Sequence, residues 1–400
     1  MTQRTELSDF SMARPAGCPF DPAPALRDDQ QEGPMRRVRL WDGSSPWLVT
    51  GYAEQRALLA HPAASAEPDS PGFPNFAKDF GKAGMSFVMM DDPEHNRLRR
   101  TVIAQFTVKR VAAMRTRVQQ IVDEQLDRML AGPKPADLVA ELALPVPSLV
   151  ICELLGVPYA DHDFFQETSR SILLREITPE ERAAATGALF GYLDTLIEAR
   201  LADPGDDMLS GLAGRITAGE LTRDEASEIG GVMLLAGHET TANMIAVGIL
   251  ALLRHPDQLA LLRANLDDPA LLASAVEELL RYLNVVHGGR RRAALADITI
   301  AGQTIRAGEG MILANETGNR DPAVFPDPDR LDIQRDARSH LAFGFGVHQC
   351  LGQPLARLEL QIVYRALLER APNLALAEPD HIPFKYEGFI YGVHELPVTW

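Results

Sequence analysis

One cysteine lies in a glycine-rich loop directly before a predicted helix. Gly344 and Gly346 precede Cys350, and Gly352 follows it. From Gln353 onward the leucines have helical spacing, so the thiol lies where the dipole of a helix N-terminus favours a thiolate. Glycines lack a Cβ and let a flat ligand approach closely. These features suit an axial thiolate ligand of haem, although the thiol alone would also fit a buried structural cysteine.

Polar groups also interrupt the most apolar stretch of the chain, residues 229–253. His238 and Glu239 would be costly in lipid, so the stretch predicts a buried core helix and not a membrane span. Thr240 can bond back to the carbonyl four residues earlier, as polar residues in helices often do. His238-Glu239 also resembles the start of a His-Glu-x-x-His zinc motif, but the fifth position is Ala242, which excludes zinc.

Charge and cysteine content exclude several classes of protein. The net charge of −16 and the lack of a basic arm argue against nucleic acid. Cys18, Cys152 and Cys350 form neither a metal-spaced pair nor a disulfide framework, which fits a reducing compartment. The N-terminal residues have no apolar core, so we expect no signal peptide or anchor. We therefore expect a cytoplasmic protein with no membrane partner.

The residue pattern predicts a mainly α protein with a minor β part. Residues 1–35 are rich in proline and predict an irregular N-terminal arm, whereas residues 36–400 show no linker and predict a single domain. A long helix is expected from about Thr222 to Arg254, and residues 297–305 predict a hairpin. Further helices are expected at 93–200 with breaks, 256–265, 269–283 and from Gln353 to about Arg370.

The cysteine loop resembles the haem-binding loop of the cytochrome P-450 superfamily. Every specified position of Phe-Gly-x-Gly-x-His-x-Cys-x-Gly is filled, from Phe343 to Gly352. The resemblance extends from about Leu40 to Trp400 and is strongest with soluble actinobacterial members. It implies the P-450 fold, with haem b between the long distal helix and the helix after the cysteine loop. Phe343, Gly344, His348 and Gly352 would then border the haem, and Cys350 would bind its iron.

The resemblance also assigns roles on the long helix. The small pair Ala236-Gly237, Glu239 and Thr240 match, in this order, the oxygen-binding kink of the family. Thr240 would hydrogen-bond dioxygen, and Glu239 would relay protons from solvent. Many relatives carry aspartate where this chain has Glu239, whose longer reach alters the relay geometry. Thr241 is the competing hydroxyl, but it points roughly 100° away around the helix.

Two further motifs concern support and cofactor binding. Glu278 and Arg281 lie three residues apart on one helix face and match the family's Glu-x-x-Arg, although an exposed ion pair of little value has the same spacing. Arg330 would be the third member, and together they would anchor the cysteine loop by charge-assisted bonds. The residues that match propionate-binding positions are His95, Arg99, Arg292 and His348; Arg290 and Arg291 adjoin Arg292 and leave a one-residue uncertainty.

Thiolate ligation favours O–O cleavage, so the resemblance implies a mono-oxygenase that uses O2 and electrons from ferredoxin and a ferredoxin reductase fed by NADPH or NADH. A peroxide-driven peroxygenase and a non-enzymatic haem sensor are the alternatives.

The substrate would be a large, mostly apolar polyketide, macrolide, sterol-like molecule or xenobiotic. Its expected lining is Met85, Phe87, Val88, Leu173, Leu174, Leu234, Val285, Val286, Ile390 and Tyr391. The basic residues expected to steer an acidic partner are Arg97, Arg100, Lys109, Arg110, Arg357 and Arg365.

Overall fold

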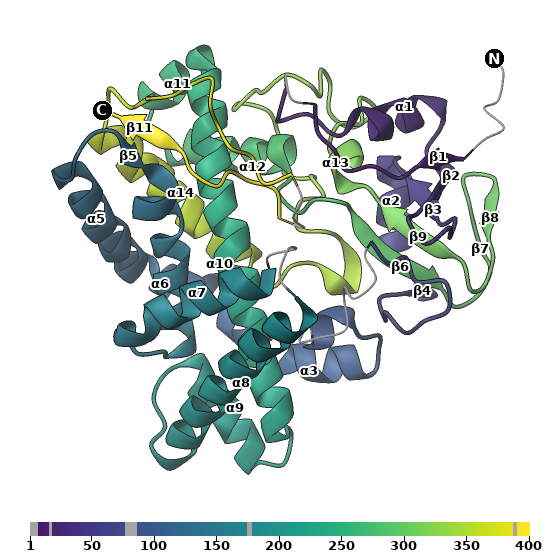
Figure 1. Ribbon diagram of the computed structural model, residues 1–400, viewed down its shortest axis with the longest axis horizontal. Coiled ribbons are helices and arrows are strands. Elements are labelled where there is room, and N and C mark those ends of the chain that lie inside the picture. Colours follow the sequence, from purple (N-terminus) through teal and green to yellow (C-terminus); the bar gives the residue numbers. More distant parts are fainter. Residues whose placement is uncertain (1–6, 16–17, 77–85, 174–177, 387–389) are drawn as a thin grey trace. The chain divides into compact units, whose positions relative to one another are not determined.

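The computed structural model describes residues 7–15, 18–76, 86–173, 178–386 and 390–400 (Figure 1). The chain forms two compact units, each assembled from segments that are far apart in the sequence. The first unit contains Met1–Ala83, Val88–His95 and Glu277–Cys350. The second contains Gly84–Phe87, Asn96–Val276 and Leu351–Trp400. The helices predominate and the strands are short, as the sequence predicts.

The first unit is built on a six-stranded sheet with the order β1-β2-β3-β9-β6-β4. Strands β1 and β2 pair parallel, as do β3 and β9, and the other neighbours pair antiparallel. The strands are β1 Ser8–Asp9, β2 Met35–Arg39, β3 Trp47–Val49, β4 Ala64–Ser65, β6 Arg290–Ala294 and β9 Gly310–Leu313. The predicted hairpin is present as β7 Ile298–Ile300 and β8 Gln303–Ile305. Helices α1 Pro24–Glu32, α2 Tyr52–Leu59 and α13 Asn315–Gly318 belong to the same unit.

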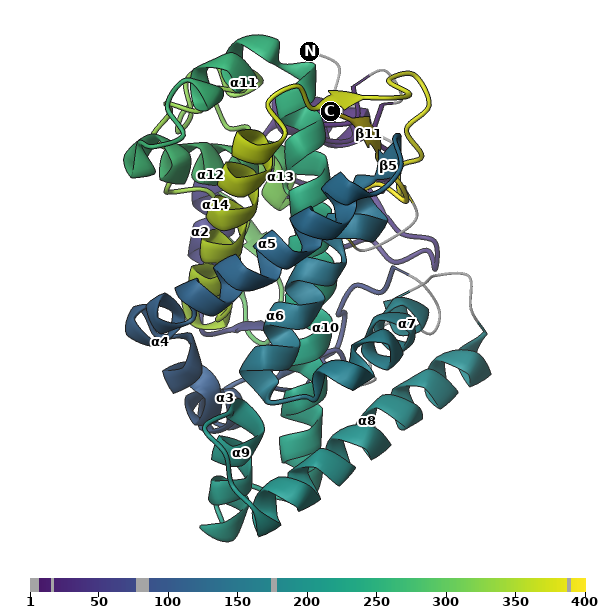
Figure 2. The same cartoon turned by 90° about the vertical axis from the view of Figure 1, so that its left-hand side faces the viewer.

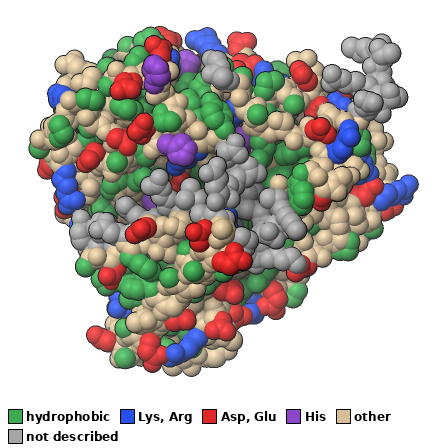
Figure 3. All heavy atoms as spheres, viewed as in Figure 1, with side chains coloured by type: hydrophobic (Ala, Val, Ile, Leu, Met, Phe, Trp, Pro, Cys, Tyr) green, Lys and Arg blue, Asp and Glu red, His purple; other side chains and the backbone are tan. Residues whose placement is uncertain are grey.

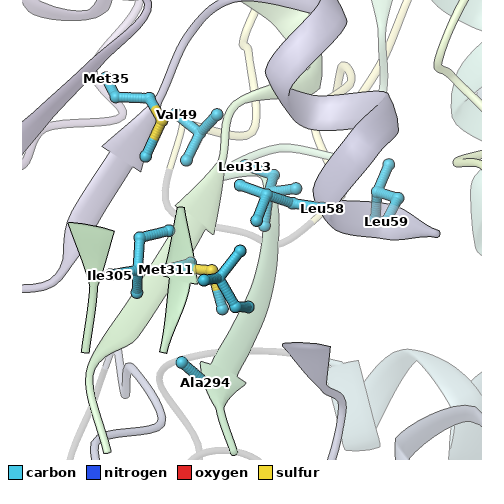
Figure 4. Packing of buried hydrophobic residues seen from close by; sticks show 9 residues of the cluster. Met35, Val49, Leu58, Leu59, Ala294, Ile305, Met311 and Leu313 are labelled. Carbon is cyan, nitrogen blue, oxygen red and sulfur yellow. The ribbon is translucent and has the colours of Figure 1, made fainter. Parts of the chain in front are cut away.

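Apolar side chains from the sheet and α2 form the core of the first unit (Figure 4). Met311 and Leu313 from β9 point into the same cluster as Val49 from β3 and Leu58 from α2. These side chains are fully buried. The core therefore holds β9 in register beside β6, the strand that carries Arg290, Arg291 and Arg292.

The N-terminal arm is more regular than the sequence predicts. Within residues 7–15 and 18–35, β1 adds a strand to the sheet, and α1 begins at Pro24, which suits the first helical position. Asp29 of α1 is buried and forms a 2.7 Å ion pair with Arg36. The prediction of an irregular arm is wrong for these residues, because the polar run Arg27–Gln31 packs as a helix against the rest of the unit.

The second unit is a bundle of helices around the 32-residue α10, Arg223–Arg254 (Figure 2). Helices α6, α8 and α14 pack against α10, and α5 packs against α14. The helices are α4 Val108–Ala113, α5 Arg115–Ala131, α6 Pro145–Leu155, α7 His162–Leu173, α8 Pro179–Ala202, α9 Met208–Thr217, α11 Pro256–Arg263 and α14 Gln353–Arg370. A small sheet has the order β10-β11-β5, with β5 Ala136–Asp137, β10 Ala375–Leu376 and β11 Pro397–Thr399. Helices α3 Glu94–Val102 and α12 Pro269–Leu283 each contribute residues to both units.

Helix α10 begins where the sequence predicts, because Thr222 and Glu225 form a reciprocal capping box. It is long and apolar enough to span a membrane, but 78% of its most apolar 18-residue window is buried inside the protein. Gly248 lets α14 approach closely, since a Cβ there would lie 2.0 Å from the Tyr364 hydroxyl oxygen. That hydroxyl donates a 2.7 Å hydrogen bond to the Met244 carbonyl. We conclude that α10 is a core helix.

Candidate active site

The cysteine loop has a backbone that only glycine accommodates at two positions. Gly344 and Gly346 have φ angles of 70° and 74°, in the left-handed region. A Cβ on Gly344 would lie 2.8 Å from the Arg290 Nε atom, and one on Gly346 would lie 2.4 Å from the Leu59 carbonyl oxygen. The Cys350 N–H donates to the Phe343 carbonyl at 2.9 Å, which closes the loop. Cys350 is left exposed three residues before α14 begins.

Strand β6 presents two arginines toward the cysteine loop and one away from it. Successive strand side chains point to opposite faces, so Arg290 and Arg292 share one face. Arg291 lies on the other face, where its guanidinium is 5.2 Å from the ring centroids of Phe73 and of Phe76. The charge of Arg290 interacts with the Cys350 thiol. The alternation therefore favours Arg290 and Arg292 over Arg291 as propionate ligands, and this assignment remains a prediction.

Arg290 and Arg292 are positive groups held in a poorly solvated environment. Burial lowers the pKa of Arg290, and burial together with the charge of Arg290 lowers the pKa of Arg292 to about 10. The buried Arg290 Nε has no hydrogen-bond partner among the described residues. Buried cations are stable when an anion is close. This pair therefore fits the carboxylates that a haem carries on its edge, beside a thiol suited to its iron.

Two histidines meet next to the same loop. The rings of His95 and His348 have centroids 4.1 Å apart, and the His95 Nδ1 atom lies 3.1 Å from an Asp92 carboxylate oxygen. The structure thus brings together two of the four residues predicted to bind propionates. Arg99 lies one turn after His95 on α3, half-buried and in the second unit, and its role remains a prediction.

A fully buried ion pair supports the segment that leads to the cysteine loop. The Arg281 Nε atom is 2.7 Å from the Glu278 carboxylate, and both side chains have zero exposure. Arg281 also donates to the carbonyls of Asn319 and Pro328 at 2.8 and 2.9 Å. Glu278 in turn accepts from the Asp332 N–H at 2.9 Å. The predicted Glu-x-x-Arg pair is therefore a buried anchor and not an exposed ion pair.

The predicted third member of this anchor is wrong. The Arg330 side chain is exposed, and only its backbone carbonyl takes part, accepting from Arg281 at 3.4 Å. Arg335 occupies the place instead, with its Nε atom 3.2 Å from the Glu278 carboxylate. Residues 331–334 separate the two arginines, and spacing along the sequence could not show which side chain points inward.

Breaking the buried anchor should destabilise the protein strongly. We expect Arg281→Met to lower the free energy of unfolding by about 3–5 kcal/mol, because it leaves a buried carboxylate short of its partner. Arg338→Met is the matched control, since Arg338 pairs with Asp336 while 79% of its side chain is exposed. The control should cost less than about 1 kcal/mol in a urea titration. Equal midpoints for the two variants would show that the anchor is unimportant.

In the middle of helix α10, the most solvent-accessible residues lie in the short segment 235–240. Ala236 is exposed, and Gly237, Glu239 and Thr240 are half-buried, whereas residues 241–252 are all buried. The Thr240 hydroxyl donates a 2.7 Å hydrogen bond to the Ala236 carbonyl. Thr241 is 4% exposed, so the structure favours Thr240 as the accessible hydroxyl.

Gly237 acts in packing within an unbroken helix. Helix α10 continues through this residue from Arg223 to Arg254. A Cβ on Gly237 would lie 3.0 Å from the Ile151 Cδ1 atom of α6. The glycine therefore permits α6 to lie close to the helix, whereas the sequence predicts a local weakening.

Glu239 is held by residues that the sequence analysis did not identify. The Lys385 Nζ atom is 2.7 Å from the Glu239 Oε1 atom, and the Asn243 amide donates to the same oxygen at 2.9 Å. Burial would raise the pKa of Glu239, but Lys385, His238 and Asn243 together hold it below its ordinary value. Lys385 lies 146 residues further along the chain, and no local pattern connects it to α10.

Removing the lysine should change how stability depends on pH. In the wild type the depressed pKa of Glu239 contributes stability that is present above the unfolded pKa of about 4.3 and is lost as the pH falls through the folded pKa. Lys385→Met removes that contribution, so the deficit in unfolding free energy should be up to about 3 kcal/mol at pH 7 and should shrink as the pH falls below about 4.3. Urea titrations from about pH 3 to about pH 7 measure it. In a Glu239→Gln background the lysine substitution should show no such pH dependence; if it does, the pair is not its source.

The predicted substrate-lining residues have different environments. Phe87, Leu234 and Tyr391 are at most 2% exposed, so they present almost no open surface, and their place in a substrate lining remains a prediction. Val285 is 8% exposed, whereas Val88 is 37% exposed and Val286 and Ile390 are half-buried. Met85 and Leu174 lie outside the described residues, as does the side chain of Leu173.

Comparison with known proteins gives a consistent result. The family model of cytochrome P450 matches residues 29–388. Cytochrome P450 GfsF from Streptomyces halstedii is 52% identical over 401 residues, which cover 99% of this chain and 97% of that protein. The crystal structure of GfsF aligns with a TM-score of 0.94 over 98% of this chain and 100% of that chain. Pentalenic acid synthase from Streptomyces avermitilis is 49% identical over 96% of this chain and 95% of that protein. The structure of the mycinamicin VIII C21 methyl hydroxylase MycCI from Micromonospora griseorubida, bound to mycinamicin VIII, is 39% identical and aligns over 99% of each chain with a TM-score of 0.89.

Haem-dependent oxygen chemistry requires parts that this chain has. They are a thiol in a closed glycine loop, poorly solvated cations beside it and an open acid–alcohol segment on a core helix. The chain belongs to the cytochrome P450 family. It is a haem-binding mono-oxygenase of bacterial type and acts with redox partners and O2 on small molecules.

Proposed function

We propose that this enzyme inserts one oxygen atom from O2 into a large, mostly apolar secondary metabolite, with haem b as its cofactor and electrons from a ferredoxin system. The half-buried Arg290 and the buried Arg292, beside the exposed Cys350 thiol, are the observation that carries the haem assignment. Haem with a thiolate ligand supplies the chemistry of O–O cleavage. We infer a cytoplasmic location, because Cys18, Cys152 and Cys350 form no disulfide within the described part of the chain.

The protein's own residues would hold the cofactor in three ways. Cys350 would hold the iron, and Arg290, Arg292, His95 and His348 would bind the propionates. Phe343, Gly344 and Gly352 would border the cofactor, as the loop motif implies. A planar group needs close backbone approach, which glycine allows. Arg330 has no part in this assignment.

Proton delivery would involve the acid and the alcohol on α10. The Thr240 hydroxyl donates to the Ala236 carbonyl, so its O–H must turn away from that carbonyl to donate a hydrogen bond to dioxygen. Glu239 would accept a proton from the solvent side and pass it toward Thr240. Its ionised form is favoured by Lys385 and Asn243, which makes it a proton acceptor at neutral pH. Both residues thereby serve the step that needs protons.

The substrate class rests on the relatives and on the half-buried apolar residues. Relatives include pentalenic acid synthase, a vitamin D3 dihydroxylase from Streptomyces griseolus, and MycCI bound to the macrolide mycinamicin VIII. Val286 and Ile390 are apolar side chains with open surface. These features favour a polycyclic or macrocyclic substrate with few polar groups.

The proposal is tested by titrating purified holoenzyme with candidate terpenoids, sterols and macrolides. A substrate should displace water and shift ferric haem from low to high spin, and it should then raise NADPH consumption in the presence of ferredoxin and its reductase. Product formed from peroxide alone, with no gain from the electron donors, would favour a peroxygenase. Spin shifts without any product would favour a haem sensor.

An acidic redox partner is favoured by a basic surface on the second unit. Helices α4 and α14 pack together and carry Lys109 and Arg357. Several of the predicted basic residues are already engaged: Arg97 pairs with Glu225, Arg110 with Asp206 and Arg365 with Asp267. Within the described part of the chain, Arg100 and Lys109 are exposed and form no ion pair. Acidic side chains are by contrast scattered over the face of α8 and α9 in Figure 3. Arg100 and Lys109 are therefore the predicted basic residues best placed to attract an acidic partner.

Charge reversal should slow electron transfer at low salt. We expect Arg100→Glu with Lys109→Glu to reduce the rate of ferredoxin-driven haem reduction by about tenfold or more, because opposite charges steer association. Arg254→Glu is the control, since it lies at the far end of α10, about 44 Å from Glu225 at 1.5 Å per residue. Stopped-flow rates between 20 and 500 mM salt should converge for all variants. Equal rates at low salt would rule out this surface.

A further inference from the structure

We propose that the N-terminal arm, through Arg14 and Met12, positions the loop Leu283–Gly289 and thereby determines which ligands the enzyme accepts on the haem. Arg14 would be a positioning residue that touches neither haem nor substrate. The inference rests on the proposed function, because the loop matters only if haem binds beside Cys350. Nothing in the cysteine loop motif or in the acid–alcohol pair involves the arm.

Arg14 is a buried cation that binds backbone carbonyls of this loop. Arg14 is only 6% exposed. The Nη1 and Nη2 atoms lie 3.2 and 3.3 Å from the Leu283 carbonyl oxygen, and Nη2 lies 3.1 Å from that of Asn284. Nη1 is also 3.4 Å from the Pro19 carbonyl oxygen. Removing a guanidinium from water is costly unless its donors are satisfied, and its planar fork suits two adjacent carbonyls.

The loop has a backbone that needs external support. Asn284 has φ +43°, a conformation that costs about 1 kcal/mol or more for a residue other than glycine. Gly288 and Gly289 have φ angles of 84° and 77°. The Asn284 side chain donates to the Val286 carbonyl at 2.9 Å, but this bond lies within the loop and cannot place it on the sheet. Arg14 supplies the link from outside.

Met12 makes a second contact from the arm. Its Sδ atom lies 2.4 Å from where a Cβ on Gly288 would be, so the thioether packs directly on the glycine backbone. Phe76 approaches the same position at 3.4 Å and is stacked on Phe10, with ring centroids 5.2 Å apart. The arm therefore contacts the loop at both ends, at Leu283–Asn284 and at Gly288.

The loop leads directly into the strand that neighbours the thiol. Val286 is four residues before Arg290, whose charge acts on Cys350, so the two Cα atoms are at most about 15 Å apart. Within residues 284–287 only Val286 is not buried. A shift of the loop would therefore move an open apolar side chain that lies within one ligand's length of the haem site. Such a shift would affect large ligands more than small ones.

The test compares a small and a large ligand of the same iron in the holoenzyme. Imidazole and clotrimazole both bind ferric haem through an imidazole nitrogen, and only clotrimazole carries three bulky aryl rings. We expect Arg14→Met to weaken clotrimazole binding at least tenfold in an optical titration and to change imidazole binding less than twofold. Met12→Ala should act in the same direction with a smaller effect, and Arg14→Lys should stay within threefold of wild type.

Arg39→Met is the matched control, because Arg39 also holds the arm, by a 2.9 Å bond to the Leu7 carbonyl and a 3.1 Å ion pair with Asp9, without contacting the loop. It should leave both affinities unchanged. Clotrimazole affinity at the wild-type level in Arg14→Met and Met12→Ala would overturn the proposal. So would an equal loss for both ligands, which would indicate general damage to the site. A wild-type protein that lacks the thiolate haem spectrum would instead overturn the proposed function.

Discussion

Replacing Cys350 by histidine should abolish the far-red-shifted Soret band that the reduced protein gives under carbon monoxide. Only thiolate ligation produces this band, and Cys350 is the thiol that combines exposure, a closed glycine loop and a neighbouring guanidinium. Mono-oxygenation should fall at least about 100-fold, since even residues that only orient a metal ligand contribute 10–100-fold. Absorbance spectra of the reduced protein and product assays measure both effects.

The other two cysteines provide the controls for this prediction. Cys152 is buried on α6, where desolvation and the charge of Asp161 raise its pKa to about 12, so it remains a thiol. Cys18 is half-buried, and burial also raises its pKa. Cys152→Ser and Cys18→Ser should both keep the band. If Cys350→His keeps it while another variant loses it, the ligand has been assigned to the wrong residue.

Replacing Thr240 by alanine should uncouple electron consumption from product formation. A positioned group that donates or relays a proton contributes about 10²–10⁴ to a rate, so product per NADPH should fall about tenfold or more while hydrogen peroxide rises. Haem binding and the substrate-induced spin shift should be nearly unchanged, because among the described residues the Thr240 hydroxyl bonds only to the Ala236 carbonyl of its own helix. Parallel assays of NADPH, peroxide and product measure the effect.

Thr241→Ala is the matched control. This neighbouring threonine is 4% exposed, so its hydroxyl lies in the core and should have little influence on coupling. Uncoupling in Thr241→Ala with full coupling in Thr240→Ala would mean that the helix presents the other threonine. Full coupling in both variants would mean that substrate or ordered water delivers the protons, and the role proposed for Glu239 would then fail as well.

Much of the fold follows from local patterns in the sequence. The capping box at Thr222 and Glu225 marks the start of α10, and α12 and α14 have the predicted bounds. Glycine positions in the cysteine loop were also informative, because the left-handed backbone at Gly344 and Gly346 excludes other residues. The structure of the N-terminal arm was harder to predict. Its proline content suggests an irregular segment, although Pro24 is the first residue of a helix.

By itself the sequence determined the cysteine loop, the acid–alcohol pair on α10 and the Glu278–Arg281 pair, because each depends on residues close together in the chain. Bond geometry and helical periodicity fix such relations before any packing occurs. Only the tertiary structure decided that Arg335 replaces Arg330, that Lys385 pairs with Glu239 and that Arg14 holds the loop before β6. Those contacts join segments up to 270 residues apart. Such contacts form where packing buries a charged group, because a buried charge is stable only beside a compensating group. The spacing of residues along the chain does not predict which distant residue provides that group.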